Sequence, residues 1–347
     1  MPHHSARPWY KEAVRATKKS MNVLRIKLLR LLVCIPAVLV AGAVLAQSYP
    51  TKPIRLVITF PPGGSTDVVA RITTARLGEV LGQPIVIENR PGGGGAIGVD
   101  AVVRAAPDGY TLLLGPTGAI TINPSLYPNL AYDPLRDLAP ITPIARAPFV
   151  LMAPLDSPFR TLRDVIDRAK EKPGAVSYGS GGNGTAMHLT GELCLLLSGT
   201  KMLHVPFKSS GLAATNMIGQ GEPNLVWADT SSMQAAQRTG RVRVLGVSMR
   251  ERSAVVPNVP TVIEAGVPGF ESIGWFGFLA PAGTPSGIID RLATETARVL
   301  QEPATRDRIL ATGNEPWTTT PAEFAAFIRT EIGNWRRVVR DSGAKVD

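Results

Sequence analysis

A proline- and glycine-rich stretch constrains this chain most: residues 60 to 67 read Phe-Pro-Pro-Gly-Gly-Ser-Thr-Asp. The apolar run before it, Ile54 to Phe60, predicts a buried strand, and the apolar spacing that begins at Val68 predicts a helix. A strand that enters a helix through glycines exposes backbone N–H groups at the positive end of the helix dipole. Such a turn can bind an anion without a basic side chain.

A second turn of the same kind occurs later in the chain. The expected strand Val176–Gly179 runs into Ser180-Gly181-Gly182-Asn183-Gly184-Thr185, and a predicted helix that contains His188 follows. Ligands of open α/β sheets bind outside the carboxyl ends of the strands. Two such loops that face each other could hold one anionic ligand from both sides, although each loop alone could also be an ordinary tight turn.

The first 46 residues have the pattern of a secretory signal peptide. An apolar run from Leu31 to Ala46 follows a short basic region (Arg25, Lys27, Arg30). We expect cleavage after Ala46 and export to the periplasm, and the residues before Met21 can be an over-extended start. A membrane anchor is the alternative, but the run is shorter than the roughly 20 apolar residues that a spanning helix needs.

Removal of the leader changes the charge balance. The whole chain has 37 basic and 27 acidic residues. The leader holds eight of the basic residues and one acidic residue, which leaves 29 basic against 26 acidic residues, a net charge of +3. This charge argues against a nucleic-acid partner. Cys194 alone remains after cleavage and is expected in the core, and two histidines, His188 and His204, are too few for a histidine-based metal site.

The mature chain alternates between expected strands and helices, which predicts an α/β fold with parallel sheets covered by helices. Its length suits two domains. The remaining expected strands are Ile85–Glu88, Thr111–Leu114, Val150–Ala153, Met202–Val205, Asn224–Trp227, Val242–Val247 and Ile273–Leu279, and the expected helices are Ala96–Ala105, Leu162–Lys170, Ala186–Leu197, Ala213–Ile218, Gly287–Leu300 and Ala322–Asp341. Thr320, Pro321 and Glu323 give the last helix a clear start signal.

Two similar apolar segments predict a hinge. Phe149–Pro154 resembles Phe276–Pro281, and the pair could form the crossovers of a two-lobed protein. We therefore expect residues 47–149 and 273–347 to form one lobe and residues 150–272 to form the other, with the segments near Phe149–Ala153 and Ile273–Ala280 as a two-strand hinge. Each lobe then contributes one of the two glycine-rich loops.

Two enzyme hypotheses compete with a binding role. Gly93 to Gly98 fits the dinucleotide motif G-x-G-x-x-G, but no acidic residue stands at the end of the next strand, so no nucleotide cofactor is expected. An exported hydrolase could use Ser180 or Ser65, with Asp229 and with His188 or His204 available as partners. The chain lacks the G-x-S-x-G elbow, because Tyr178 stands where the first glycine would be. We therefore expect no catalytic residues.

The ordered motifs resemble one family, the extracytoplasmic solute receptors of tripartite tricarboxylate transporters, called Bug or TctC-type receptors. The resemblance covers nearly all of the mature chain. It rests on Phe60–Asp67, Asn89–Gly98, Pro107–Leu112, Tyr132–Pro134, Ser177–Gly182, His204–Lys208, Val259–Gly266 and Trp275–Pro285.

The resemblance implies a type II periplasmic-binding-protein fold with a ligand cleft between two lobes, no enzymatic activity and no cofactor. It implies a receptor that captures a small organic carboxylate and passes it to the membrane subunits of the transporter, with a monomer expected. The residues implied at the ligand are Gly63, Gly64, Ser65, Thr66 and Asp67 in the first loop, Ser180, Gly181, Gly182, Thr185 and His188 at the second, and Thr117 and Asp229 at strand ends that border the cleft.

The sequence departs from the family pattern between residues 208 and 224. Ser209 stands where the family usually has glycine, Asn216 stands where it usually has aspartate, and residues 219–223 replace a Gly-Gly-Gln-Val run. These differences can indicate a ligand unlike the common dicarboxylates or only a changed turn.

Overall fold

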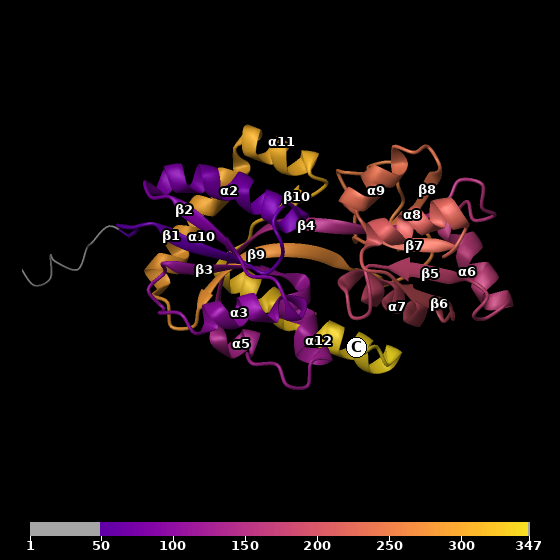
Figure 1. The fold of residues 1–347 in the computed structure, drawn as a ribbon, viewed down its shortest axis with the longest axis horizontal. Coiled ribbons are helices and arrows are strands. Elements are labelled where there is room, and N and C mark those ends of the chain that lie inside the picture. Colours follow the sequence, from indigo (N-terminus) through magenta and orange to yellow (C-terminus); the bar gives the residue numbers. More distant parts are fainter. Residues whose placement is uncertain (1–48, 346–347) are drawn as a thin grey trace, which may run out of the picture. The chain divides into compact units, whose positions relative to one another are not determined.

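The computed structural model describes residues 49–345 (Figure 1). The predicted signal peptide, its cleavage after Ala46 and the extra start before Met21 lie outside the described residues. No helix within residues 49–345 combines the length and apolarity that a membrane-spanning segment needs.

One group of strands brings the first loop to a sheet edge. The strand order is β2 (Ile85–Asn89), β1 (Ile54–Ile58), β3 (Thr111–Pro116), β9 (Ile273–Pro281) and β4 (Leu138–Pro154), and the short β10 (Glu315–Pro316) pairs with β4. β1 is parallel to both β2 and β3, whereas β9 is antiparallel to β3 and β4. The prediction of parallel sheets is therefore wrong for the pairing of β9 with β3 and with β4.

β4 continues from this group into a second one, as Figure 1 shows along the middle of the molecule. Its last residues pair antiparallel with β7 (Leu225–Asp229) and β8 (Val242–Val247). β5 (Ser177–Ser180) is parallel to β7 and to β6 (Leu203–Pro206). The change of partner is abrupt, because Pro148 still pairs with Ile273 of β9 and Phe149 already pairs with Asp229 of β7.

Helices cover both strand groups. The longer helices are α2 (Ser65–Leu81), α3 (Ala96–Val103), α6 (Leu162–Glu171), α7 (Ala186–Ser198), α8 (Ser210–Gln220), α9 (Thr230–Gln237), α10 (Ser286–Gln301), α11 (Pro303–Ala311) and α12 (Pro321–Ser342), and the short ones are η1 (Gly93–Gly95), η2 (Gly118–Ile122), α4 (Asn123–Leu126) and α5 (Pro134–Asp137). All seven helices expected from the sequence are present, and α9 and α11 were not foreseen. The capping box at the start of α12 is confirmed, since Thr320 and Glu323 cap each other's backbone N–H groups.

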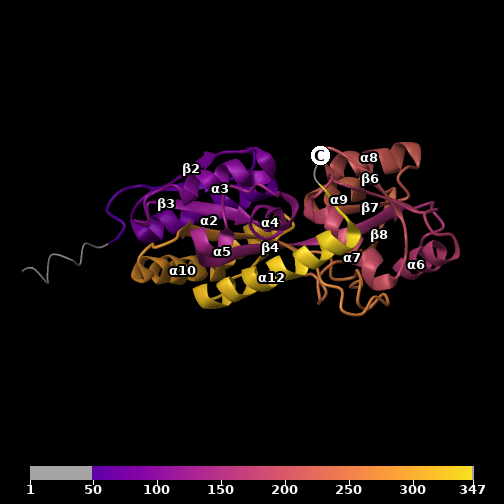
Figure 2. The same ribbon diagram turned by 90° about the horizontal axis from the view of Figure 1, so that it is seen from below.

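The last helix joins two hydrophobic cores. Phe324, Ile328 and Ile332 pack in the core around β3 and β9, whereas Trp335 and Val338 pack in the core around β5, β7 and α7. Figure 2 shows α12 lying lengthwise below β4 and reaching α7. Cys194 is buried in the second of these cores, as predicted.

Candidate binding site

Strand register brings the carboxyl ends of the two strand groups toward each other. In the first group, Pro116 at the end of β3 lies level with Phe276, which pairs with Ala145 of β4. In the second group, β5 and β7 run toward Phe149 of the same strand. The loop after β1 and the loop after β5 therefore both lie at the edges that face each other across residues 146–149 of β4.

The first loop ends in a helix start without a side-chain cap. Gly64 is the N-cap of α2 and offers no side chain to the first N–H groups, and the first intrahelical bond runs from Val68 N–H to the Gly64 carbonyl. Gly63 has φ +86°, a conformation that favours glycine. The α2 N-terminus therefore presents main-chain donors and the positive end of a 17-residue helix dipole.

Asp67 points back into its own loop. Its carboxylate accepts hydrogen bonds from the Arg71 guanidinium (2.8 and 3.0 Å), Gly63 N–H (3.0 Å) and the Asn89 amide (3.1 Å). These donors, Arg71 foremost, lower the pKa of Asp67 to about 2. The side chain therefore holds the loop shape with a neutralised charge.

Ser65 has a partner that the sequence did not suggest. The Asn314 side-chain Nδ2 lies 2.9 Å from the Ser65 Oγ, across 249 residues of sequence. Asn314 is fully buried in the turn between α11 and β10. The only sequence signal at this position is Gly313, whose φ of +81° marks a tight turn.

Several hydrogen-bond donors of the second loop bond to acceptors within the loop and the start of α7. The Thr185 hydroxyl caps α7 by accepting from His188 N–H (3.3 Å) and donates to the Gly182 carbonyl (2.8 Å). Gly182 N–H donates to the Ser180 Oγ (3.1 Å), and Gly184 N–H donates to the His188 Nδ1 (3.0 Å). Unlike the α2 start, this helix start is capped from within.

Two histidines stack beneath this loop. The rings of His188 and His204 lie 3.9 Å apart at an interplanar angle of 11°. The His204 Nε2 is 2.7 Å from the Ser180 Oγ, and the His188 Nε2 is 3.7 Å from a Glu192 oxygen that also accepts from the Tyr178 hydroxyl.

Burial sets the protonation of this cluster. It lowers the pKa of His188 to about 4 and, together with the charge of His188, the pKa of His204 to about 3. The same burial raises the pKa of Glu192. Both imidazoles are therefore neutral near pH 7. Ser180 is fully buried and pairs with His204, not with His188, of the two histidines that the hydrolase alternative considered.

Thr117 and Asp229 are engaged with the protein itself. The Thr117 Oγ1 accepts from Trp275 N–H (2.7 Å) and is 3.3 Å from the Trp275 carbonyl. Asp229 is the N-cap of α9 and accepts from Ser232 N–H (2.8 Å) and from the hydroxyls of Ser210, Ser231 and Ser232. Burial acts to raise the pKa of Asp229, but these hydrogen bonds lower it below its usual value. Both residues shape the strand ends that they occupy.

Two glycines of the rejected dinucleotide motif allow close packing between α3 and its neighbours. A Cβ on Gly98 would lie 2.9 Å from the Arg90 carbonyl oxygen and 3.0 Å from a Thr59 methyl carbon. A Cβ on Gly95 would lie 2.9 Å from the Ala119 Cβ. These glycines therefore let α3 pack closely on the end of β1.

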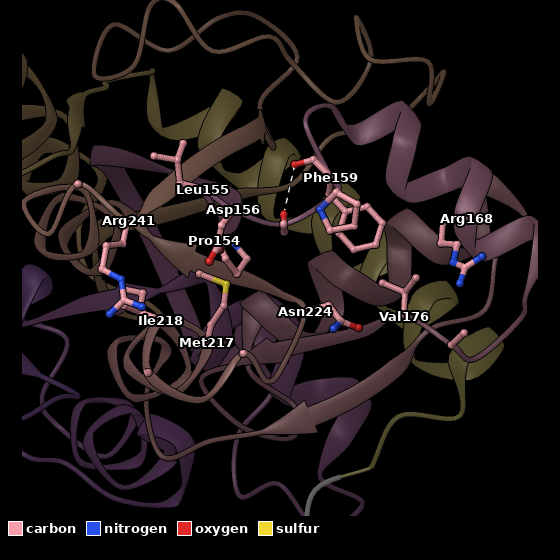
Figure 3. A pocket seen from close by; sticks show the side chains of 16 residues that line it. Pro154, Leu155, Asp156, Phe159, Arg168, Val176, Met217, Ile218, Asn224 and Arg241 are labelled. Carbon is pink, nitrogen blue, oxygen red and sulfur yellow. Dashed lines mark hydrogen bonds between the residues drawn. The ribbon is translucent and has the colours of Figure 1, made fainter.

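A cavity of about 880 Å³ lies away from the predicted site. Figure 3 shows its wall, which includes Pro154, Phe159, Val176, Asn224 and Arg241. Val176 and Asn224 immediately precede β5 and β7, so the cavity lies at the amino ends of these parallel strands, opposite the second loop. None of the site residues expected from the sequence lines it.

The departures from the family pattern lie along α8 and in the turn that follows it. Ser209 caps the helix by accepting from Leu212 N–H, and Asn216 donates to the Leu212 carbonyl on the exposed side. Residues 219–223 form the turn before β7, near the cavity of Figure 3. Within residues 49–345, no group of three or more His, Cys, Asp or Glu side chains could hold a metal ion.

Comparison with known proteins identifies the family. The profile described as the tripartite tricarboxylate transporter family receptor, TctC, matches residues 69–344. The chain is 38% identical over 311 residues to the protein BugT of Bordetella pertussis, an alignment that covers 88% of this chain and 94% of BugT.

Solved structures show the same fold. Rpa4515 of R. palustris, solved with adipate, is 33% identical with a TM-score of 0.74 over 86% of this chain and 99% of its own. MatC of Rhodopseudomonas palustris, solved with bound malate, is 32% identical with a TM-score of 0.70 over 84% of this chain and 100% of its own. These matches confirm the predicted two-lobe binding-protein fold. The chain belongs to the family of tripartite tricarboxylate transporter receptors, which are periplasmic solute-binding proteins and not enzymes.

Proposed function

We propose that the protein binds a small organic carboxylate between the loops at residues 60–67 and 180–185 and delivers it to the membrane subunits of a tripartite tricarboxylate transporter. The observation that carries this proposal is the uncapped N-terminus of α2 at the edge that faces the second strand group. The relatives solved with adipate and malate support a carboxylate ligand.

The first loop is proposed to bind the negative charge. The N–H groups of residues 65–67 have no carbonyl four residues earlier within the helix, and Gly64 provides no cap. A carboxylate that accepts from these groups also lies at the positive end of the helix dipole. Asp67 does not oppose this anion, because Arg71 and Asn89 hold its carboxylate on the inner side of the loop.

The second loop is proposed to contact the other end of the ligand. Its N–H groups at Gly182, Gly184 and His188 are already bonded within the loop, so it has fewer donors for a charge. Gly181, Gly182 and Thr185 remain the proposed contacts. Ser180 and His188 are proposed to support the loop from below, since both side chains bond within the cluster.

Ligand capture is proposed to close the two lobes. The lobe boundaries 47–149 with 273–347 and 150–272 are supported by β4, which changes its pairing between Pro148 and Phe149. A ligand that contacts both loops binds the closed arrangement better than the open one, and this difference drives closure. We propose that the receptor acts as a monomer in the periplasm, which light scattering of the mature chain would test.

Calorimetry on the mature protein from residue 47 tests the proposal. The panel is malate, adipate and citrate, each with its amide or methyl ester as a neutral control. We expect at least one acid to bind and its neutral analogue to bind at least tenfold more weakly. A neutral analogue that binds as well as its acid would contradict anion recognition. Chemical turnover of a bound acid would contradict the receptor role.

A further inference from the structure

The buried amide of Asn314 has a defined orientation. Its Nδ2 lies 2.8 Å from the Thr312 Oγ1 and 3.4 Å from the Thr312 carbonyl oxygen, which can only accept. The Thr312 hydroxyl donates its own proton to the Ile309 carbonyl at 2.6 Å, so its oxygen is also an acceptor here. The nitrogen of Asn314 must therefore face these two oxygens.

This orientation determines the role of the Ser65 hydroxyl. The second N–H of the amide points to the Ser65 Oγ at 2.9 Å, so the serine oxygen accepts. A hydroxyl has one proton to donate, and this proton must then point away from Asn314. Ser65 is the first residue of α2, where the uncapped N–H groups also lie. The serine proton is therefore not directed at Asn314 and is available to another acceptor.

The turn that carries Asn314 is anchored on both sides. The Gly313 carbonyl accepts from the Thr230 hydroxyl at 2.7 Å, and a Cβ on Gly313 would lie 2.6 Å from the Thr230 Oγ1. The Glu315 carboxylate accepts from the Ser253 hydroxyl, Ala254 N–H and the Arg146 guanidinium at 2.6 to 2.9 Å. The amide of Asn314 is thus held by a rigid support.

The other atom of the amide is left without a partner. The Asn314 Oδ1 is buried and has no hydrogen-bond donor among the described residues. An unsatisfied buried acceptor destabilises the folded state. The hydrogen bonds that hold the amide therefore all involve Nδ2.

We propose that Asn314 is a positioning residue of the carboxylate site: it fixes Ser65 as a hydrogen-bond donor toward the ligand. The inference rests on the proposed function, because it assigns the donor that meets the carboxylate beside the α2 amides. Asn314 itself does not touch the ligand, since it is fully buried behind Ser65.

A double-mutant cycle tests this role, with the strongest binder among malate, adipate and citrate as the probe. We expect Ser65→Ala and Asn314→Ala each to raise the Kd about tenfold, and the double variant to raise it by no more than about 20-fold. Asn314→Asp keeps the side-chain shape but removes the donor, so it should weaken binding at least as much as Asn314→Ala. Thr330→Val makes a comparable substitution on α12, where the hydroxyl bonds the Ala326 carbonyl of the same helix, and should change the Kd less than threefold.

If the two substitutions acted independently, the double variant would bind about 100-fold more weakly, and this result would overturn the proposal. So would an Asn314→Asp variant that binds like the unsubstituted protein, or a Thr330→Val variant that loses as much affinity as Asn314→Ala. Amide hydrogen exchange without ligand separates this inference from the function. We expect Asn314→Ala to speed exchange at least tenfold at Val68, whose N–H is the first that α2 bonds to its own backbone. If no acid of the panel binds, the proposed function fails on these probes, and unchanged exchange would then overturn the positioning role.

Discussion

The proposed binding by main-chain donors predicts a specific loss when one N–H is removed. Proline at position 65 removes the first free N–H of α2 and fits the local backbone. Proline is favoured at the first helical position, and Gly64 before it has φ −73° and ψ 167°, the extended conformation that a following proline requires. We therefore expect Ser65→Pro to keep α2 intact.

The expected magnitude follows from the hydrogen bond to a charged group. Such a bond contributes about 1.5–3 kcal/mol, which corresponds to a roughly 10- to 150-fold rise in Kd. Ser65→Ala is the matched control, because it also removes the hydroxyl that Asn314 orients but keeps the N–H. The difference between the two variants isolates the main-chain donor.

Calorimetry with the strongest binder of the panel measures both Kd values, and urea unfolding measures the stability of both variants. We expect Ser65→Pro to bind at least tenfold more weakly than Ser65→Ala at similar unfolding free energy. Equal Kd values for the two variants would refute the reasoning that the α2 N-terminus binds the anion through its backbone.

Three further predictions concern stability, each measured by urea unfolding. Thr185→Ala removes the cap of α7 and should lower the free energy of unfolding by about 1 kcal/mol; no change would contradict the capping role. Because the pKa of Asp67 is lowered to about 2, Asp67→Asn should cost about 2 kcal/mol at pH 7, a loss that disappears as the pH falls from about 4 to 2; a loss that persists at pH 2 would contradict it. The lowered pKa values of His188 and His204 mean that the folded state favours the neutral rings. The stabilisation of the folded state by these neutral rings is present above about pH 6.5 and is lost as the pH falls toward 4. Relative to a His188→Gln/His204→Gln variant, the native protein should lose about 2 kcal/mol per imidazole between pH 7.5 and 5. Both proteins contain Glu331, whose pKa is raised to about 7 and whose contribution to stability falls as the pH rises, so its effect cancels in the comparison. Parallel curves of unfolding free energy against pH for the two proteins would refute the prediction.

The sequence predicted local elements better than their pairing. Apolar runs and start signals located the expected strands and most helices, because these features depend on neighbouring residues. Strand direction depends on which strands meet, and β9 lies antiparallel between β3 and β4 although 156 residues separate Pro116, the end of β3, from Ile273, the start of β9. The alternation of strands and helices along the sequence does not show that a distant strand will insert antiparallel between two others. α11 was missed because Pro303 suggests a break, whereas here it is the first residue of the helix.

The hydrogen-bond partners of the expected site residues could not be predicted from the sequence. Thr117 and Asp229 follow or end strands, Asp67 lies in the first turn of α2, and the family resemblance placed all three at the ligand. In the structure their polar atoms bond to Arg71, to the β9 backbone and to the start of α9. A sequence shows that a carboxylate stands at a strand end but not which donors reach it first. Asn314 was missed for the same reason, since its partner Ser65 is distant in the chain.

The two glycine-rich loops look equivalent in sequence, and the structure distinguishes them by one residue each. Gly64 leaves the α2 start uncapped, whereas Thr185 caps α7. A capped helix start has fewer donors for an anion, because one of its N–H groups is already satisfied. The stacked histidines beneath the second loop are neutral near pH 7 and add no positive charge there. We therefore expect the first loop to select for negative charge, and the second loop to select for the length and shape of the ligand.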